Sequence, residues 1–237
     1  MLRISNLTKV YRNGKVAVDD LTLHVEAGDI FGFIGHNGAG KTTTLKCCSG
    51  IIPFDQGEIL IDGLSILNDP VTCKLKMAFI PDNPEIYTFL TGIQYLNLVA
   101  DIYRVPVSVR EERVEKYAKE LQLYDNLADS VSSYSHGMKQ KLAIIAAFLH
   151  EPKLLLLDEP FVGLDPKAAF TVKQIMQELC DRGSAVFFST HVLEVAEKLC
   201  NKIAIIKDGK LVISGPTEKV KGEKGLEALF LELVQDE

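Results

Sequence analysis

The stretch Gly-His-Asn-Gly-Ala-Gly-Lys-Thr at residues 35–42 constrains the fold of this chain more than any other. It matches the pattern G-x-x-x-x-G-K-[ST], and it lies between a short apolar run at residues 29–34 and a Thr-rich helical start. A chance match to these fixed positions in 237 residues is roughly a one-in-a-hundred event. The order predicts a buried strand, a glycine turn and a helix N-terminus, and therefore an α/β fold.

The residue types of this loop suit the binding of phosphate groups. Glycines let the backbone wrap a phosphate so that several N–H groups point inward, and the helix N-terminus adds a positive partial charge. Lys41 then supplies a charge for the outer phosphates, and Thr42 offers a hydroxyl to Mg²⁺. Kinases, GTPases and motor ATPases share such a loop. A GTPase would need an Asn-Lys-x-Asp motif, whereas the single Asn-Lys pair, residues 201–202, is followed by Ile-Ala.

Two consecutive carboxylates follow the four leucines at residues 154–157. Asp158 ends this apolar run, where it is placed to help hold Mg²⁺ through water. Glu159 is the next residue, so its side chain is expected to point elsewhere, toward a water that attacks the γ-phosphate, as a general base. Alone, an Asp-Glu pair would be interpreted as a solvated strand end. The phosphate loop earlier in the chain reverses that interpretation.

The remaining patterns predict strands and helices that alternate. Continuous apolar runs at residues 154–157 and 185–189 are typical of parallel strands covered on both faces. Residues 166–182 predict a helix between them, with Asp165 as its cap, Pro166 in its first turn and Gly183 at its end.

Hairpins are predicted near both ends of the chain. Residues 2–11 and 16–25 alternate around a turn and predict an antiparallel pair. Residues 202–214 predict a second hairpin with an Asp208-Gly209 turn, and residues 226–234 predict a last helix.

Residues 84–150 predict an inserted helical subdomain, because no convincing strand pattern occurs in them. Thr91-x-x-Gln94 and Ser108-x-x-Glu111 each match a capping box, which predicts a helix start at each.

Composition limits the classes of function. A net charge of −6 and a pI of about 5.5 argue against a dedicated nucleic-acid binder. Five cysteines, with no C-x-x-C pair, suit a reducing compartment and are interpreted as small core residues. We expect no signal peptide in the polar N-terminal stretch, and no transmembrane helix, because no uninterrupted apolar run reaches ~18 residues.

Five motifs in a fixed order resemble those of the ATP-binding subunits of ABC transporters. They are GHNGAGKTT at 35–43, YSHGMKQK at 134–141, LLLLDEP at 154–160, GLDP at 163–166 and STH at 189–191. The resemblance covers nearly the whole chain and implies a P-loop NTPase fold of the ABC-ATPase type. That α/β fold has a mixed, mainly parallel core sheet flanked by helices, an antiparallel β subdomain and an inserted helical subdomain. We expect one nucleotide-binding domain at 1–237, with its catalytic core at 1–83 and 151–237 and its helical subdomain at 84–150.

The resemblance implies a role for each matching residue. The residues implied to bind ATP, with Tyr11 stacked on adenine, are Tyr11, Gly35, His36, Asn37, Gly38, Ala39, Gly40, Lys41, Thr42 and Thr43. The implied catalytic residues are Glu159, His191 and Lys41. The implied Mg²⁺ ligands are Thr42, Asp158 and Asp82. The signature residues, implied to act on the nucleotide of a second chain, are Ser135, His136, Gly137 and Met138. Asp165 matches the loop residue that crosses the dimer interface.

Two positions depart from the family pattern. Asp82 occupies the place of a glutamine that usually contacts Mg²⁺ and the attacking water; its side chain is shorter and charged, and a carboxylate can still ligate Mg²⁺. His136 stands where the signature usually has glycine, and it adds a titratable ring beside the phosphate.

The resemblance implies an ATP hydrolase coupled to transport, with ATP and Mg²⁺ as cofactors. A second nucleotide-binding subunit would complete the site, in a homodimer or a heterodimer. Integral membrane permease subunits would contact the groove near Asp82 and the helical region, and they would hold the chain at the cytoplasmic face of the membrane. No nucleic-acid partner is expected. The signature sequence and residues 80–85 resemble the corresponding segments of ATPases of bacterial exporters. The sequence does not specify which cargo is exported.

Two other classes of function stay open at this point. The first is a soluble ABC ATPase that acts on ribosomes or DNA, although such proteins usually carry two fused nucleotide domains, long coiled-coil insertions or basic extensions. The second is a regulatory subunit that senses ATP without turnover. Glu159 argues against the second class, because a sensing site has no need of a base.

Overall fold

A six-stranded sheet forms the centre of the structure, a computed structural model that describes residues 1–235. Its strand order is β10-β9-β3-β8-β7-β6, and all neighbours are parallel except β10 and β9. The strands are β3 (Ile30–Ile34), β6 (Met77–Ile80), β7 (Leu154–Asp158), β8 (Ala185–Thr190), β9 (Lys202–Lys207) and β10 (Lys210–Pro216). The parallel strands predicted at 154–157 and 185–189 are confirmed, as is the second hairpin.

Both faces of this sheet are buried, which explains its continuous apolar runs. Leu154 and Leu156 pack into a core shared with the antiparallel sheet, whereas Leu155 and Leu157 pack into a core shared with the helices. All four leucines are 0–1% exposed. The run of four therefore follows from a strand that has no solvent-facing side.

A four-stranded antiparallel sheet packs beside the central sheet, in the order β2-β1-β4-β5. Its strands are β1 (Leu2–Val10), β2 (Val16–Val25), β4 (Gln56–Ile61) and β5 (Leu64–Ser65). The predicted pairing of β1 with β2 is confirmed, and β4 adds to the other edge of β1. Sequence patterns did not predict β4, β5 or β6.

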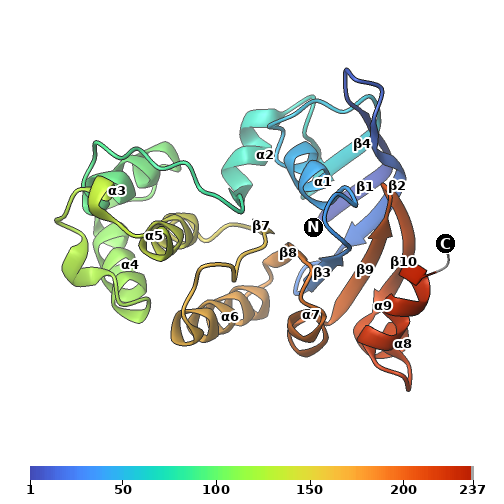
Figure 1. Ribbon diagram of the computed structural model, residues 1–237. Coiled ribbons are helices and arrows are strands. Elements are labelled where there is room, and N and C mark those ends of the chain that lie inside the picture. The colour runs from blue at the N-terminus through green and yellow to red at the C-terminus, as the bar shows by residue number, and fades with distance from the viewer. Residues whose placement is uncertain (236–237) are drawn as a thin grey trace.

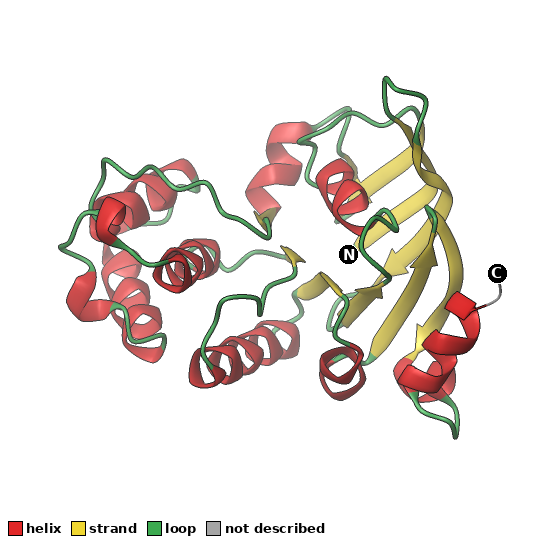
Figure 2. Ribbon diagram, in the orientation of Figure 1, coloured by secondary structure: helices red, strands yellow, loops and turns green. Residues whose placement is uncertain are grey.

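The helices gather in two places (Figures 1 and 2). Helices α3, α4 and α5 lie together at one end, away from the antiparallel sheet, and the others border the strands. The helices are α1 (Lys41–Cys48), α2 (Pro70–Lys76), α3 (Gly92–Ile102), α4 (Val107–Glu120), α5 (His136–Phe148), α6 (Pro166–Asp181), α7 (Leu193–Leu199), α8 (Thr217–Lys221) and α9 (Leu226–Gln235), with 3₁₀ turns η1 (Tyr124–Asn126) and η2 (Val131–Ser133). Since α3–α5 fall between β6 and β7, they occupy the predicted insertion, whose boundaries stay a prediction.

One predicted capping box is present and the other is wrong. The Thr91 hydroxyl accepts a hydrogen bond from the Gln94 N–H, and the Gln94 side chain accepts one from the Thr91 N–H. Helix α4, however, begins at Val107, so Ser108 lies inside its first turn. Pro106 takes the cap position, because its fixed φ of −57° is suited to a helix entry and its carbonyl accepts the first helical bond.

Two expectations from composition can be compared with the fold. All five cysteines are free and buried, as predicted for small core residues. Within residues 1–235, the structure has no helix whose length and apolarity would let it cross a bilayer.

A partly buried histidine joins the helical end of the molecule to the sheet. His150 stacks on Tyr103 with ring centroids 3.7 Å apart, and its Nε2 lies 3.3 Å from the Met77 carbonyl oxygen. Because a carbonyl only accepts, Nε2 carries the hydrogen of a neutral ring. Burial lowers the pKa of His150 from 6.5 to about 4.

His150 should make the stability of the protein pH-dependent. The unfolded chain takes up a proton that the native ring refuses, so the free energy of unfolding falls by about 3 kcal/mol between about pH 6.5 and pH 4. His150→Phe, which keeps a ring against Tyr103, should flatten this dependence in chemical denaturation. His24→Phe, at an exposed histidine of β2, should leave it unchanged. Equal slopes for His150→Phe and the parent would refute the assignment.

Candidate functional site

The phosphate loop connects β3 to α1 in a conformation that only glycine tolerates at residue 40. Gly40 has a φ of 109°, and a Cβ added there would lie 2.3 Å from the Ala17 carbonyl oxygen. A side chain at this position would therefore push the loop away from β2.

Lys41 begins α1 and is almost fully buried in the loop. Its Nζ donates hydrogen bonds to the carbonyl oxygens of Gly35, at 2.7 Å, and His36, at 3.2 Å. Burial lowers the pKa of Lys41, while the carboxylates of Glu159 and Asp158 act in the opposite direction. The partners of this ammonium group are therefore two backbone carbonyls and the carboxylate of Glu159.

Asp158 and Glu159 diverge at the end of β7, as the sequence predicts for neighbours. Asp158 is 1% exposed, and its Oδ1 accepts a hydrogen bond of 2.5 Å from the Ser189 hydroxyl on the adjacent strand β8. Glu159 adopts a left-handed φ of 48°, and its N–H lies 3.1 Å from the same Ser189 oxygen. The strand therefore ends at once, and the Glu159 side chain turns away from Asp158.

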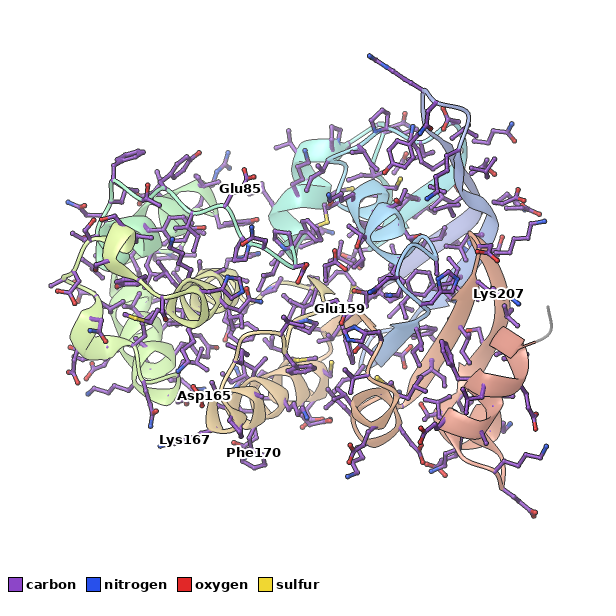
Figure 3. All side chains as sticks on the ribbon, viewed as in Figure 1. Glu85, Glu159, Asp165, Lys167, Phe170 and Lys207 are labelled. Carbon is purple, nitrogen blue, oxygen red and sulfur yellow. The ribbon has the colours of Figure 1, made fainter. Side chains whose placement is uncertain are left out.

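The carboxylate of Glu159, which Figure 3 labels, lies near two groups that come from distant parts of the chain. Its Oε1 is 2.9 Å from His191 Nδ1 and 3.7 Å from Lys41 Nζ. The side chain of Glu159 is 14% exposed, whereas that of His191 is 51% exposed. A carboxylate placed here can accept a proton beside the predicted phosphate site, while the imidazole is open to solvent.

A cavity contains most of the residues implied to bind nucleotide and metal. The residues that line it are Tyr11, Lys15, Ala17, Asn37, Gly38, Gly40, Lys41, Thr42, Thr43, Asp82, Asp158 and Glu159. The Tyr11 hydroxyl also lies 3.2 Å from the Thr43 hydroxyl. Lys15, just before β2, and Ala17, in β2, were not predicted, because this part of the sequence gives no signal for a ligand.

The oxygen ligands of this cavity fit Mg²⁺. Thr42 offers a hydroxyl, and Asp158 and Asp82 offer carboxylates. Across residues 1–235, the structure contains no group of three or more His, Cys, Asp or Glu side chains arranged to hold a metal ion. Mg²⁺ does not need one, because it keeps several waters and takes substrate phosphate oxygens with one or two carboxylates.

The signature residues lie outside this cavity. Ser135 caps α5, as predicted, because its Oγ accepts a hydrogen bond of 3.2 Å from the Met138 N–H. Among the described residues, none of the predicted signature set lines the cavity. Within one chain, the structure therefore does not bring the signature to the phosphate loop.

The signature helix is tied to the loop that precedes α6. Lys141 Nζ lies 2.8 Å from the carboxylate of Asp165, which is labelled in Figure 3. Asp165 also caps α6, as predicted, because its Oδ1 accepts a hydrogen bond from the Ala168 N–H. The Lys141 ammonium, followed by the Ala168 N–H, lowers the pKa of Asp165. The ring of His136 lies against Gly163, where an added Cβ would be 2.7 Å from His136 Cδ2. Sequence reasoning missed the role of Lys141, although it belongs to the quoted motif.

Comparisons with known proteins agree on one family. A sequence model described as "ABC transporter" matches residues 18–162. The uncharacterized ABC transporter ATP-binding protein YhcH of Bacillus subtilis is 38% identical over 213 residues, which are 90% of this chain and 68% of YhcH. The SkfA peptide export ATP-binding protein SkfE of the same organism is 35% identical over 212 residues, 90% of this chain and 87% of SkfE.

Solved structures share the fold over nearly the whole chain. The structure of an ATP-binding subunit of an ABC transporter superposes with a TM-score of 0.94 at 33% identity, covering 99% of this chain and 100% of that one. The dimeric, post-hydrolysis structure of the ATP-binding cassette MJ0796, bound to ADP and Pi, superposes with a TM-score of 0.83 at 25% identity, covering 92% and 99%.

Proposed function

The chain belongs to the family of ABC transporter ATP-binding proteins, and on this premise we propose that it hydrolyses ATP to drive a separate membrane permease. One observation carries the hydrolytic part of the proposal. The Glu159 carboxylate lies within 3.7 Å of the phosphate-loop lysine and 2.9 Å of His191, beside a cavity with Mg²⁺-type ligands. This supports turnover rather than the sensing of ATP alone.

Each residue of the cavity would contribute one part of the reaction. Loop N–H groups and Lys41 would bind the phosphates, and Glu159 would take the proton of the attacking water. His191, whose ring is half exposed, would contact the γ-phosphate from the solvent side. Bound Mg²⁺ would neutralise phosphate charge and would be held by Thr42 and Asp158, with Asp82 beside them.

A second copy of the chain would complete each site. The signature lies outside the cavity of its own chain, and its helix N-terminus can offer N–H groups to the phosphate of a partner. The dimeric structure of MJ0796 supports this arrangement. ATP would therefore favour a closed dimer, and hydrolysis would release it.

We propose that the direction of transport is export and that the chain acts at the cytoplasmic face of the membrane. The name of SkfE, which refers to peptide export, supports it. The permease would dock in an apolar groove between β6, its following loop and the helices α3 and α5. Residues of this groove include Ile51, Phe79, Tyr95, Val99, Tyr103 and Ala147, with Glu85 also lining it (Figure 3).

A charge placed in this groove should uncouple the chain from its permease. Val99 is partly buried in the groove, so Val99→Glu would bring an unpaired carboxylate into the interface. We expect association to weaken at least about tenfold, with ATP binding unchanged. The measurement is co-purification with a candidate permease, a protein of about six apolar spans encoded in a neighbouring reading frame, and ATPase stimulated by that permease in vesicles.

Val107→Glu is the matched control, because Val107 is 63% exposed at the start of α4 and does not line the groove. It should associate like the parent. If Val99→Glu also associates like the parent, the groove is not the permease site. If the parent binds a ribosomal or DNA partner and no membrane protein, the transport proposal fails.

A further inference from the structure

The turn between β9 and β10 lies against the phosphate loop without reaching the nucleotide cavity. The Gly209 N–H donates a hydrogen bond of 2.9 Å to the Ala39 carbonyl oxygen. The Asp208 carboxylate lies 3.5 Å from His36 Nε2. Neither Asp208 nor Gly209 lines the cavity, so both would act on a nucleotide only through the loop.

Strand β9 also supports the beginning of the loop. A Cβ added to Gly35 would lie 2.5 Å from the Ile206 carbonyl oxygen. The loop is therefore in close contact with β9 at its first glycine and with the following turn near its last glycine. Residues 206–209 are far in sequence from the phosphate loop at residues 35–42, so tertiary structure alone sets this contact.

The Asp208-Gly209 turn is also attached to strand β2. The Asp19 N–H donates a hydrogen bond of 2.9 Å to the Gly209 carbonyl oxygen. A Cβ added to Gly209 would lie 3.1 Å from the Ala17 carbonyl oxygen, which is the same atom that excludes a side chain at Gly40. Strand β2, the turn and the loop thus meet around one carbonyl group.

The contact between His36 and Asp208 depends on the charge of the imidazole. His36 Nδ1 lies 2.8 Å from the Asn37 carbonyl oxygen, which only accepts, so Nδ1 carries a hydrogen. A neutral ring then presents the lone pair of Nε2 to the carboxylate, whereas a protonated ring presents an N–H. The charged groups near His36 are the Asp208 carboxylate and the Lys41 ammonium, which donates to the His36 carbonyl.

We propose that the Asp208-Gly209 turn positions the phosphate loop and thereby sets the affinity for nucleotide. The proposal rests on the proposed function, since it concerns the same nucleotide site. A loop whose N–H groups are already aimed inward loses less freedom when a phosphate binds. Gly209 supplies the backbone contact, and Asp208 adds an ion pair with protonated His36.

Gly209→Ala tests the backbone contact, with Gly225→Ala as the matched control. The two glycines have φ values of 81° and 82°, but an added Cβ meets no atom within 4 Å at Gly225. Both changes strain the backbone, but only the first crowds Ala17 of β2, whose carbonyl oxygen also faces Gly40 of the loop. We expect Gly209→Ala to raise the Kd of a fluorescent ATP analogue about tenfold, with kcat at saturating ATP nearly unchanged. Gly225→Ala should bind like the parent.

Asp208→Asn tests the ion pair without disturbing the turn, because Asn also tolerates the left-handed φ of 49° at this position. The pair is partly exposed, so the expected rise in Kd is only about two- to threefold. In a His36→Asn background, Asp208→Asn should have no further effect.

Each outcome decides the proposal. Equal Kd values for the two alanine variants would overturn the positioning role of the turn. If Gly209→Ala fails to fold, the double-mutant cycle decides, and additive effects of His36→Asn and Asp208→Asn would overturn the proposal. A parent that binds no nucleotide would instead overturn the proposed function. The remaining case is that the parent binds nucleotide, Lys41→Met does not, and the turn variants bind like the parent. The proposal for the turn then fails, and the proposed function stands.

Discussion

Replacement of Glu159 by glutamine is expected to lower ATP hydrolysis by roughly 10²–10⁴-fold and to leave an ATP-bound dimer. Glutamine keeps the shape of the side chain but cannot take a proton from the attacking water. The hydrogen bond from Ser189 to Asp158, and those from Lys41 to the loop, do not involve the Glu159 side chain, so nucleotide binding should persist. Without hydrolysis the closed dimer would not be released.

Phosphate release and gel filtration in the presence of Mg²⁺ and ATP measure the two effects. Glu194→Gln is a matched control, because Glu194 lies near His191 in sequence but is exposed and pairs with Lys198. It should hydrolyse ATP like the parent and should not accumulate as a dimer. Unchanged steady-state hydrolysis in Glu159→Gln would contradict the role of general base.

Lys41→Met is expected to lower the affinity for ATP by at least about a hundredfold. Methionine fills much of the space of the buried lysine stem, so the loop should keep its packing. The loss is that of charge-assisted contacts with phosphate, worth about 1.5–3 kcal/mol for one hydrogen bond to a charged group, in a site where Lys41 is only 6% exposed.

Equilibrium binding of a fluorescent ATP analogue measures this change. Lys198→Met removes an exposed lysine from α7 and should bind nucleotide like the parent. Parental affinity in Lys41→Met would show that the loop does not hold the outer phosphates. Thermal unfolding without nucleotide should show that the variant remains folded.

Several features of the fold follow from residues that are neighbours in sequence, which is why they could be predicted. The phosphate loop, the caps at Thr91, Ser135 and Asp165, and the Asp208-Gly209 turn each depend on a few adjacent residues. Ser108 shows the limit of such patterns. It matches a capping box, yet Pro106 takes the cap position and the helix begins at Val107, so the Ser-x-x-Glu pattern alone did not locate the helix start.

Strands β4 and β6 and helix α7 were missed for a different reason. Each is short, and its stability comes from pairing or packing with elements far away in the sequence, such as β4 with β1 and β6 with β7. Local propensity is weak over so few residues, and long-range pairing decides the structure. The boundaries of the helical subdomain and the roles of the site residues depend on such long-range contacts, and they stay predictions.

By itself, the sequence determined the chemistry of the site: a glycine loop with Lys41 and Thr42, two carboxylates after a buried strand, and a capped signature helix. Only the tertiary structure decided how these parts meet. Parallel pairing of β7 with β8 places Ser189 on Asp158, and the left-handed φ of Glu159 turns its carboxylate toward Lys41 and His191. The order of strands in a parallel sheet depends on contacts between distant segments, and no local pattern of residues encodes it.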